Sequence, residues 1–223
     1  GSAVFFAGCL MAISTYSELQ TEIAEWVNRS DLTARIPTFI SLCEAKLNRE
    51  LRLRVQEANY PLSLAAGESS VALPDGFVEP LALWEVEASG NRPLRFVPPS
   101  ALDKDATAGD LTKWSIDGTN IIFGRPAGSA VSLLFRMRSA FALSDAEPTN
   151  WLLTNYPDVY LYGSICEAEH FSRDDEAMMV AKARCDEAMR SVKRLNAKSQ
   201  SGGTLAVETQ MQPRRNDYEG YYW

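Results

Sequence analysis

The sequence predicts an α+β fold: a helical bundle of about four helices with an inserted antiparallel β meander or small barrel and an extended C-terminal tail. Apolar residues recur at helical spacing toward both ends of the chain, and they alternate with a period of two in its middle. The helical pattern stops at Ser199. We therefore divide the chain into an N-terminal extension (1–12), a helical bundle (13–57 and 141–198), a β insertion (58–140) and a C-terminal arm (199–223).

The first two helices are predicted from capping residues and periodicity. Residues 14–29 start with Thr15 and, three positions later, Glu18, the spacing of a capping box. The second helix covers roughly 33–54, where Pro37 is tolerable only near the first turn. The expected apolar face of the first helix is Leu19, Ile23, Trp26 and Val27, and that of the second is Ile36, Ile40, Cys43, Leu47 and Leu51.

Seven short apolar runs, each closed by turn residues, predict seven strands in the β insertion. They read YPLSL, SVALP, PLALWEVE, RPLRFV, TKWSI, NIIFG and AVSLLFRMR. Asp75-Gly76 and Asp117-Gly118 are turn signals of the kind that join strands. PPSALDKDA, between the fourth and fifth runs, predicts one short helical turn.

The stretch TNWLLTNYPDVYLYGSICEAEH, residues 149–170, is apolar or aromatic on nearly every side. Thr149 or Asn150 can cap a short turn, and Pro157 suits the first turn of a new helix. Gly163 costs about 1 kcal/mol relative to alanine in a helix, which is most reasonable where another backbone approaches closely. The helix is either unusually buried in the core or partly in contact with another subunit. A last helix over about 174–198 has an apolar stripe of Met178, Ala181, Cys185, Ala188, Val192 and Leu195.

Composition and charge are those of a globular protein that does not hold nucleic acid. The 223 residues are 46% hydrophobic and 23% charged, with a net charge of −7. Proteins that neutralise phosphates are normally basic, so direct DNA binding is disfavoured. No apolar run approaches the roughly 18 residues needed to cross a bilayer, so no membrane contact is expected.

The residues that could carry chemistry are few. The cysteines, Cys9, Cys43, Cys166 and Cys185, form no C-x-x-C pair, which favours reduced, buried thiols. His170 is the only histidine, so metal sites and triads built on histidine are poorly provided for. Cys166 and His170 could form a nucleophile–base pair, but this cysteine lies in mid-helix in an apolar run. We predict no enzyme, no cofactor and no metal.

The two ends of the chain allow alternatives. GSAVFFAGCL faintly resembles a lipoprotein cleavage box ending at Cys9, yet no basic residue precedes it and its apolar part is short. We favour a tag or upstream sequence, with the native start at Met11. The arm is either disordered or held by a neighbouring chain, and its aromatic end favours the second interpretation.

Two parts of the chain carry a resemblance to a known family. IPTFISLCEAKLNREL and TNWLLTNYPDVYLYG, placed on either side of a β insertion, resemble the adaptor (head–tail connector) proteins of tailed bacteriophages over about residues 13–197. The resemblance implies a structural virion protein, assembled in the host cytoplasm, that forms a ring of usually twelve copies beneath the portal protein. Such a ring extends the DNA channel, lets genomic DNA pass without specific binding, and provides a platform for the tail or nozzle protein.

The resemblance gives particular residues a role. An all-round apolar helix suits packing against the next copy in a ring, which assigns inter-subunit contacts to Trp151, Tyr160, Tyr162 and Gly163. An arm that grips the portal, as in some adaptors, assigns portal contacts to Leu205, Val207, Tyr218, Tyr221, Tyr222 and Trp223.

A different class of function is the alternative. A carbohydrate- or receptor-binding module of a virion or cell-surface protein, carried on a helical stalk, would use exposed tryptophans in a cleft of the sheet. Trp84 and Trp114 are the candidates, although both also suit core packing.

Overall fold

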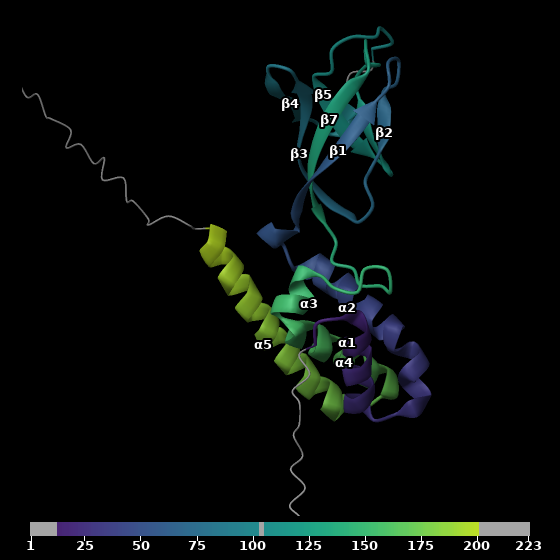
Figure 1. Cartoon of the computed structure of the whole chain (residues 1–223), viewed down its shortest axis with the longest axis vertical. Coiled ribbons are helices and arrows are strands. Elements are labelled where there is room, and N and C mark those ends of the chain that lie inside the picture. Colours follow the sequence, from purple (N-terminus) through teal and green to yellow (C-terminus); the bar gives the residue numbers. More distant parts are fainter. Residues whose placement is uncertain (1–12, 103–104, 201–223) are drawn as a thin grey trace, which may run out of the picture.

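The predicted α+β class is confirmed. The computed structural model describes residues 13–102 and 105–200, which contain five α-helices and seven strands. The helices gather at one end of the molecule and the sheet stands at the other (Figure 1). Each part has a separate hydrophobic core.

The first two helices begin and end where their local sequence requires. In α1 (Tyr16–Val27) the capping box is confirmed: Thr15 Oγ1 accepts a bond from the Glu18 amide at 3.3 Å, and Glu18 Oε2 accepts one from the Thr15 amide at 3.0 Å. Asn28, in the left-handed conformation, ends the helix. A 3₁₀ turn, Ser30–Arg35, leads into α2 (Ile36–Glu50), whose first turn contains Pro37 as predicted.

Three helices follow the sheet. Asn150 caps the short α3 (Trp151–Asn155), its Oδ1 accepting a bond from the Leu153 amide at 2.9 Å. Pro157 opens α4 (Pro157–Ser172). Asp174 caps α5 (Asp175–Gln200) through a 3.0 Å bond from the Ala177 amide. α5 therefore includes residues 199 and 200, which the sequence pattern assigned to the arm.

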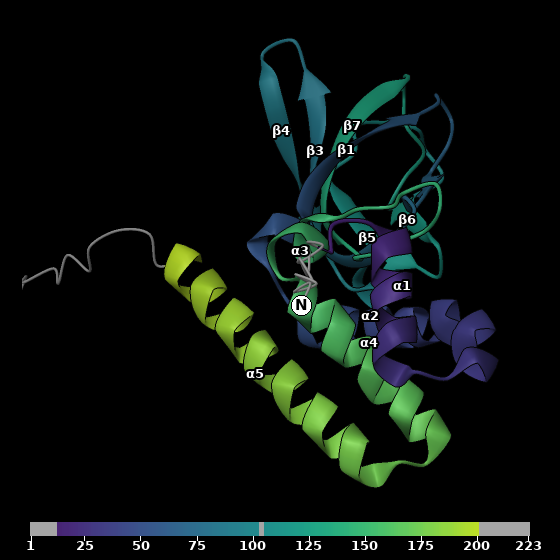
Figure 2. The ribbon, with the colours of Figure 1, turned by 60° about the horizontal axis from the view of Figure 1, so that its bottom comes forward.

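α4 is the central helix of the helical region, which answers the question raised by its composition. α1, α2, α3 and α5 all pack against it, and Figure 2 shows α5 running alongside it. Because four helices of its own chain surround it, most of its apolar surface is covered without a second subunit. Its buried residues are Val159, Tyr160, Leu161, Gly163, Ser164, Ile165, Cys166 and Ala168.

Gly163 allows α2 and α4 to come together. A Cβ placed on this residue would overlap Cys43 Sγ of α2 and would also lie 3.5 Å from Cys185 Sγ of α5. The close neighbour is a side chain, whereas the sequence had suggested a backbone. Both sulfur atoms belong to the same chain, so the glycine serves packing within the subunit.

The seven strands form a mixed sheet, which corrects the expected antiparallel meander. The order is β1-β7-β3-β4-β5-β6-β2, so β1 pairs with the last strand, and β4 pairs with β5 in parallel. β1 and β2, at opposite ends of this order, also contact each other, so the sheet is nearly closed. The strands are β1 (Glu57–Leu64), β2 (Ser70–Ala72), β3 (Phe77–Glu87), β4 (Gly90–Phe96), β5 (Lys113–Asp117), β6 (Asn120–Phe123) and β7 (Val131–Ser139).

Polar contacts join the sheet to the helical region. Asn48 of α2 donates to the Phe141 carbonyl and accepts from the Phe141 amide, both at 2.8 Å. Gln56 Nε2 donates to the Ser139 carbonyl at 3.3 Å, and the Ser139 hydroxyl donates to the Gln56 carbonyl at 3.2 Å. The segment that enters the sheet at Gln56 and the segment that leaves it at Ser139 are thus hydrogen-bonded to each other.

The contact of Gly163 with Cys43 gives a test of the core. We expect Gly163→Ala to lower the free energy of unfolding by about 1–3 kcal/mol, since overpacking outweighs the better helix propensity of alanine. Cys43→Ala removes the overlapping sulfur. Gly163→Ala should therefore lower the free energy of unfolding much less in the Cys43→Ala background than in the unmodified chain. Urea unfolding of the four proteins measures this coupling. Equal effects of Gly163→Ala in both backgrounds would show that the two residues do not meet.

A half-buried carboxyl group, that of Glu44, makes the stability of the fold depend on pH. Tyr160 donates to Glu44 Oε1 at 3.4 Å, and Asn150 Nδ2 donates to the Tyr160 oxygen at 2.8 Å. Burial raises the pKa of Glu44 from 4.5 to about 7. The folded chain therefore keeps a proton that the unfolded chain loses, so this group's contribution to stability falls as pH rises from about 4.5 to about 7.

We expect Glu44→Gln to remove this dependence. Relative to the unmodified chain, the variant should gain stability across that interval and keep a constant advantage above it. Urea unfolding at a series of pH values measures the difference, in which the other carboxylates cancel. If the difference in stability between the two proteins does not change with pH, the pKa of Glu44 is not raised in the folded chain.

Candidate interaction surfaces

The first candidate surface is a groove of about 420 Å³ between α1, α4 and α5, which we call the Trp26 groove. Trp26 of α1 meets Tyr162 of α4 edge to face, with ring centroids 5.9 Å apart, and 56% of Trp26 stays exposed. The Arg184 guanidinium of α5 lies 5.6 Å from the centre of the Tyr162 ring. Val180 is also 56% exposed, so the groove presents an aromatic and apolar surface to solvent.

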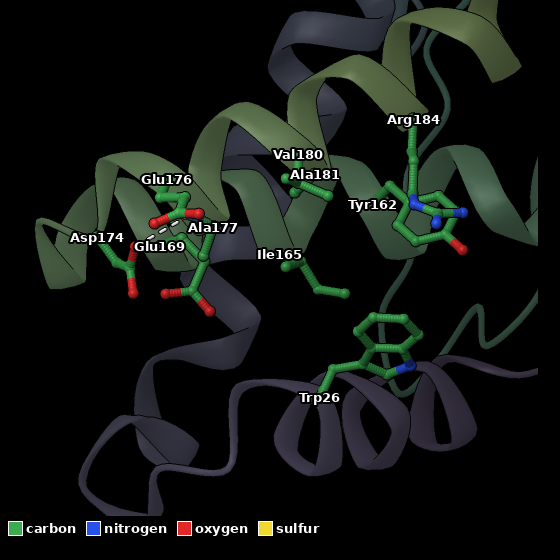
Figure 3. Close-up of a pocket in the computed structure, with 10 residues that line it drawn as sticks. All are labelled: Trp26, Tyr162, Ile165, Glu169, Asp174, Glu176, Ala177, Val180, Ala181 and Arg184. Carbon is green, nitrogen blue, oxygen red and sulfur yellow. Dashed lines mark hydrogen bonds between the residues drawn. The ribbon is translucent and has the colours of Figure 1, made fainter.

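One end of the Trp26 groove is acidic. Figure 3 shows Glu169, Asp174 and Glu176 together at this end, with Trp26, Tyr162 and Arg184 at the other. Partial burial raises the pKa of Glu169, and the charge of Asp174 raises it further. A cationic side chain placed at this end would relieve the repulsion among the three carboxylates.

The second candidate surface is a groove of about 240 Å³ beside the C-terminal part of α5, which we call the Trp151 groove. Trp151 is 39% exposed, and its ring centroid lies 5.4 Å from that of Tyr156. Leu195 of α5 and Val55, just before β1, are also exposed large apolar residues. Asn196 fixes the floor of the groove by accepting from the Arg54 amide and donating to the Arg52 carbonyl, both at 3.0 Å.

The residues predicted for inter-subunit contacts fall into two groups. Trp151 and Tyr162 line the two grooves, and for them the assignment stays a prediction. Tyr160 and Gly163 are buried in the chain's own core, so they offer a neighbour no surface; the all-round apolar pattern of α4 reflects packing within the subunit. The portal-contact residues Leu205, Val207, Tyr218, Tyr221, Tyr222 and Trp223 lie outside the described residues.

The sequence did not predict Trp26, Val180 or Val55 as surface residues. Trp26 follows the helical spacing of Leu19 and Ile23, which are fully buried, and periodicity therefore placed it in the core. α1 ends one residue beyond Trp26, where the neighbouring helices no longer cover it. Its position in the last turn of the helix is the signal that could have indicated exposure.

The described cysteines, which were candidates for chemistry, are buried. Cys43, Cys166 and Cys185 are free and buried, and burial raises the pKa of each thiol, that of Cys185 to about 11. In residues 13–102 and 105–200, no group of three or more His, Cys, Asp or Glu side chains could hold a metal ion. The same ranges contain no helix with the length and apolar content to cross a membrane.

The sheet offers little to the carbohydrate-binding alternative. Trp114 is buried in the sheet core, where its indole nitrogen donates to the Leu94 carbonyl at 3.1 Å and its ring packs edge to face on Phe135. Trp84 is only partly exposed. The two tryptophans therefore do not form an exposed pair that could stack on a sugar.

Comparison with protein-family models identifies the family of the chain. A family model described as SU10 adaptor protein matches residues 14–208, a span that includes all five helices and all seven strands. No curated protein sequence matches the chain.

Proposed function

The chain belongs to the SU10 adaptor protein family, and we propose that it forms a ring at the head–tail junction of a tailed bacteriophage. The family identifies a structural adaptor and a component of the virion. In the proposed assembly, which has twelve copies as is usual in similar adaptors, the ring attaches to the portal protein. It extends the DNA channel and carries the tail or nozzle protein.

The observation that carries this proposal is the extent of the family match. It covers the helical region and the sheet together, so it concerns the whole described architecture and not a single motif. The exposed aromatic residues of the Trp26 and Trp151 grooves add support, because tryptophan and tyrosine are enriched where proteins bind proteins.

The charge of the chain supports a channel that does not bind DNA. At a net charge of −7 the chain has little capacity to neutralise phosphates, so DNA can move past it without being held. A carbohydrate-binding function is supported less well, since Trp114 lies in the core of the sheet.

We assign portal attachment to the C-terminal arm. α5 leads directly into residues 201–223, whose sequence ends in Tyr221, Tyr222 and Trp223. Aromatic side chains are frequent anchors at interface centres, where truncation of one can cost on the order of 2 kcal/mol. The arginines Arg214 and Arg215 are expected at the wet rim of the contact.

Deletion of residues 201–223 should abolish attachment to the portal protein of the same phage and leave the fold intact, because the apolar core lies upstream. Alanine at Tyr221, Tyr222 and Trp223 together should weaken attachment far more than alanine at the matched pair Arg214 and Arg215. Co-sedimentation with portal measures occupancy, and circular dichroism checks the fold. If the truncated chain still binds the portal at full occupancy, the portal-binding surface lies on the helices or the sheet.

Native mass spectrometry tests the proposed ring itself. The isolated chain should be a monomer or a weak oligomer, because like-charged acidic copies repel one another, and should form a multimer on the portal. A tight dimer that is unchanged by portal contradicts the proposed function.

A further inference from the structure

The two grooves lie toward opposite ends of one long helix. Val180 of the Trp26 groove and Leu195 of the Trp151 groove are both on α5, fifteen positions apart, which corresponds to about 22 Å along the helix axis. Figure 2 shows the C-terminal part of α5 extending past the N-terminal end of α4. A single chain therefore presents two separate apolar surfaces that cannot cover each other.

We propose that the Trp151 groove of one copy packs on the Trp26 groove of the next copy, and that this contact joins neighbouring subunits. The inference rests on the proposed ring and names the surfaces that would close it. A contact between two different patches is heterologous, and it generates a closed ring when the rotation between copies is right. Two patches on one rigid helix fix that rotation.

Charge favours this mixed pairing over a pairing of the same groove from two copies. The Trp26 groove is lined by three carboxylates and one guanidinium, that of Arg184. The Trp151 groove is lined by one charged residue, the exposed Arg54. Two Trp26 grooves face to face would bring six carboxylates together, whereas the mixed pairing brings the Arg54 cation to the acidic end.

The apolar residues of the two grooves also suit each other. Each groove has an exposed tryptophan beside a tyrosine, and each has an exposed aliphatic residue on α5, Val180 or Leu195. Side chains of this kind form the centres of interfaces, and the charged groups at the edges then select the partner and the register.

Cross-linking distinguishes the mixed pairing from a symmetric one. In a Cys9→Ser background, we would prepare Val180→Cys, Leu195→Cys and the double variant, assemble them on portal, and treat them with a short bis-maleimide. The native Cys43, Cys166 and Cys185 are buried and serve as an unreactive background. We expect no dimer from either single variant, dimers from a mixture of the two, and a ladder of multimers from the double variant. Homodimers of a single variant overturn the inference.

Charge reversal tests the same contact without cross-linking. Glu176→Lys and Arg54→Glu should each weaken multimer formation roughly tenfold, because each places like charges across the contact. The double variant should recover most of the loss, since it restores opposite charges. Glu187→Lys, at an exposed position of α5 outside both grooves, is the matched control and should have little effect. Failure of the double variant to recover also overturns the pairing.

The outcomes separate the inference from the proposed function. Multimers that form on portal without cross-links between positions 180 and 195 overturn the pairing and leave the ring intact. A chain that forms no multimer on portal overturns both.

Discussion

The burial of most of α4 among the other helices is the constraint on which the rest of the structure depends. A largely apolar helix must be covered over most of its surface, and in this chain α1, α2, α3 and α5 cover it. Gly163 permits the contact with α2, because a larger residue would collide with Cys43. Each of the two grooves has its exposed tryptophan at the end of a covering helix, Trp26 in the last turn of α1 and Trp151 in the first turn of α3.

The sheet is attached to this helical region by polar contacts. Asn48 pairs with both backbone groups of Phe141, where the chain leaves the sheet. Close by, Arg138 bridges Glu57 and Glu79, and Arg136 pairs with Glu57 at 2.7 Å. The contacts of Asn48 connect the sheet to the helical region, and the arginine pairs join β1, β3 and β7 at the end of the sheet next to it. In a ring built by the helical regions, every copy would then present its sheet in the same direction.

Local features of the fold could be predicted from the sequence, and long-range ones could not. The Thr15–Glu18 capping box, the entry of α4 at Pro157 and the seven strands depend on neighbouring residues, and all three were predicted. The parallel pairing of β4 with β5 and the pairing of β1 with β7 join distant segments, about which periodicity carries no information. For the same reason the pattern placed Trp26 in the core, since it cannot show which helices cover which surface.

Hydrogen–deuterium exchange of the free and portal-bound chain tests the central claim most directly, namely that α4 is interior and that assembly uses the surfaces at the ends of its covering helices. The account predicts slow exchange of α4 in both states. It also predicts new protection on assembly in the last turn of α1, at 174–184 and at 192–198. Fast exchange of α4 in the free chain, with protection gained there on assembly, would contradict it by showing that α4 itself is the subunit interface.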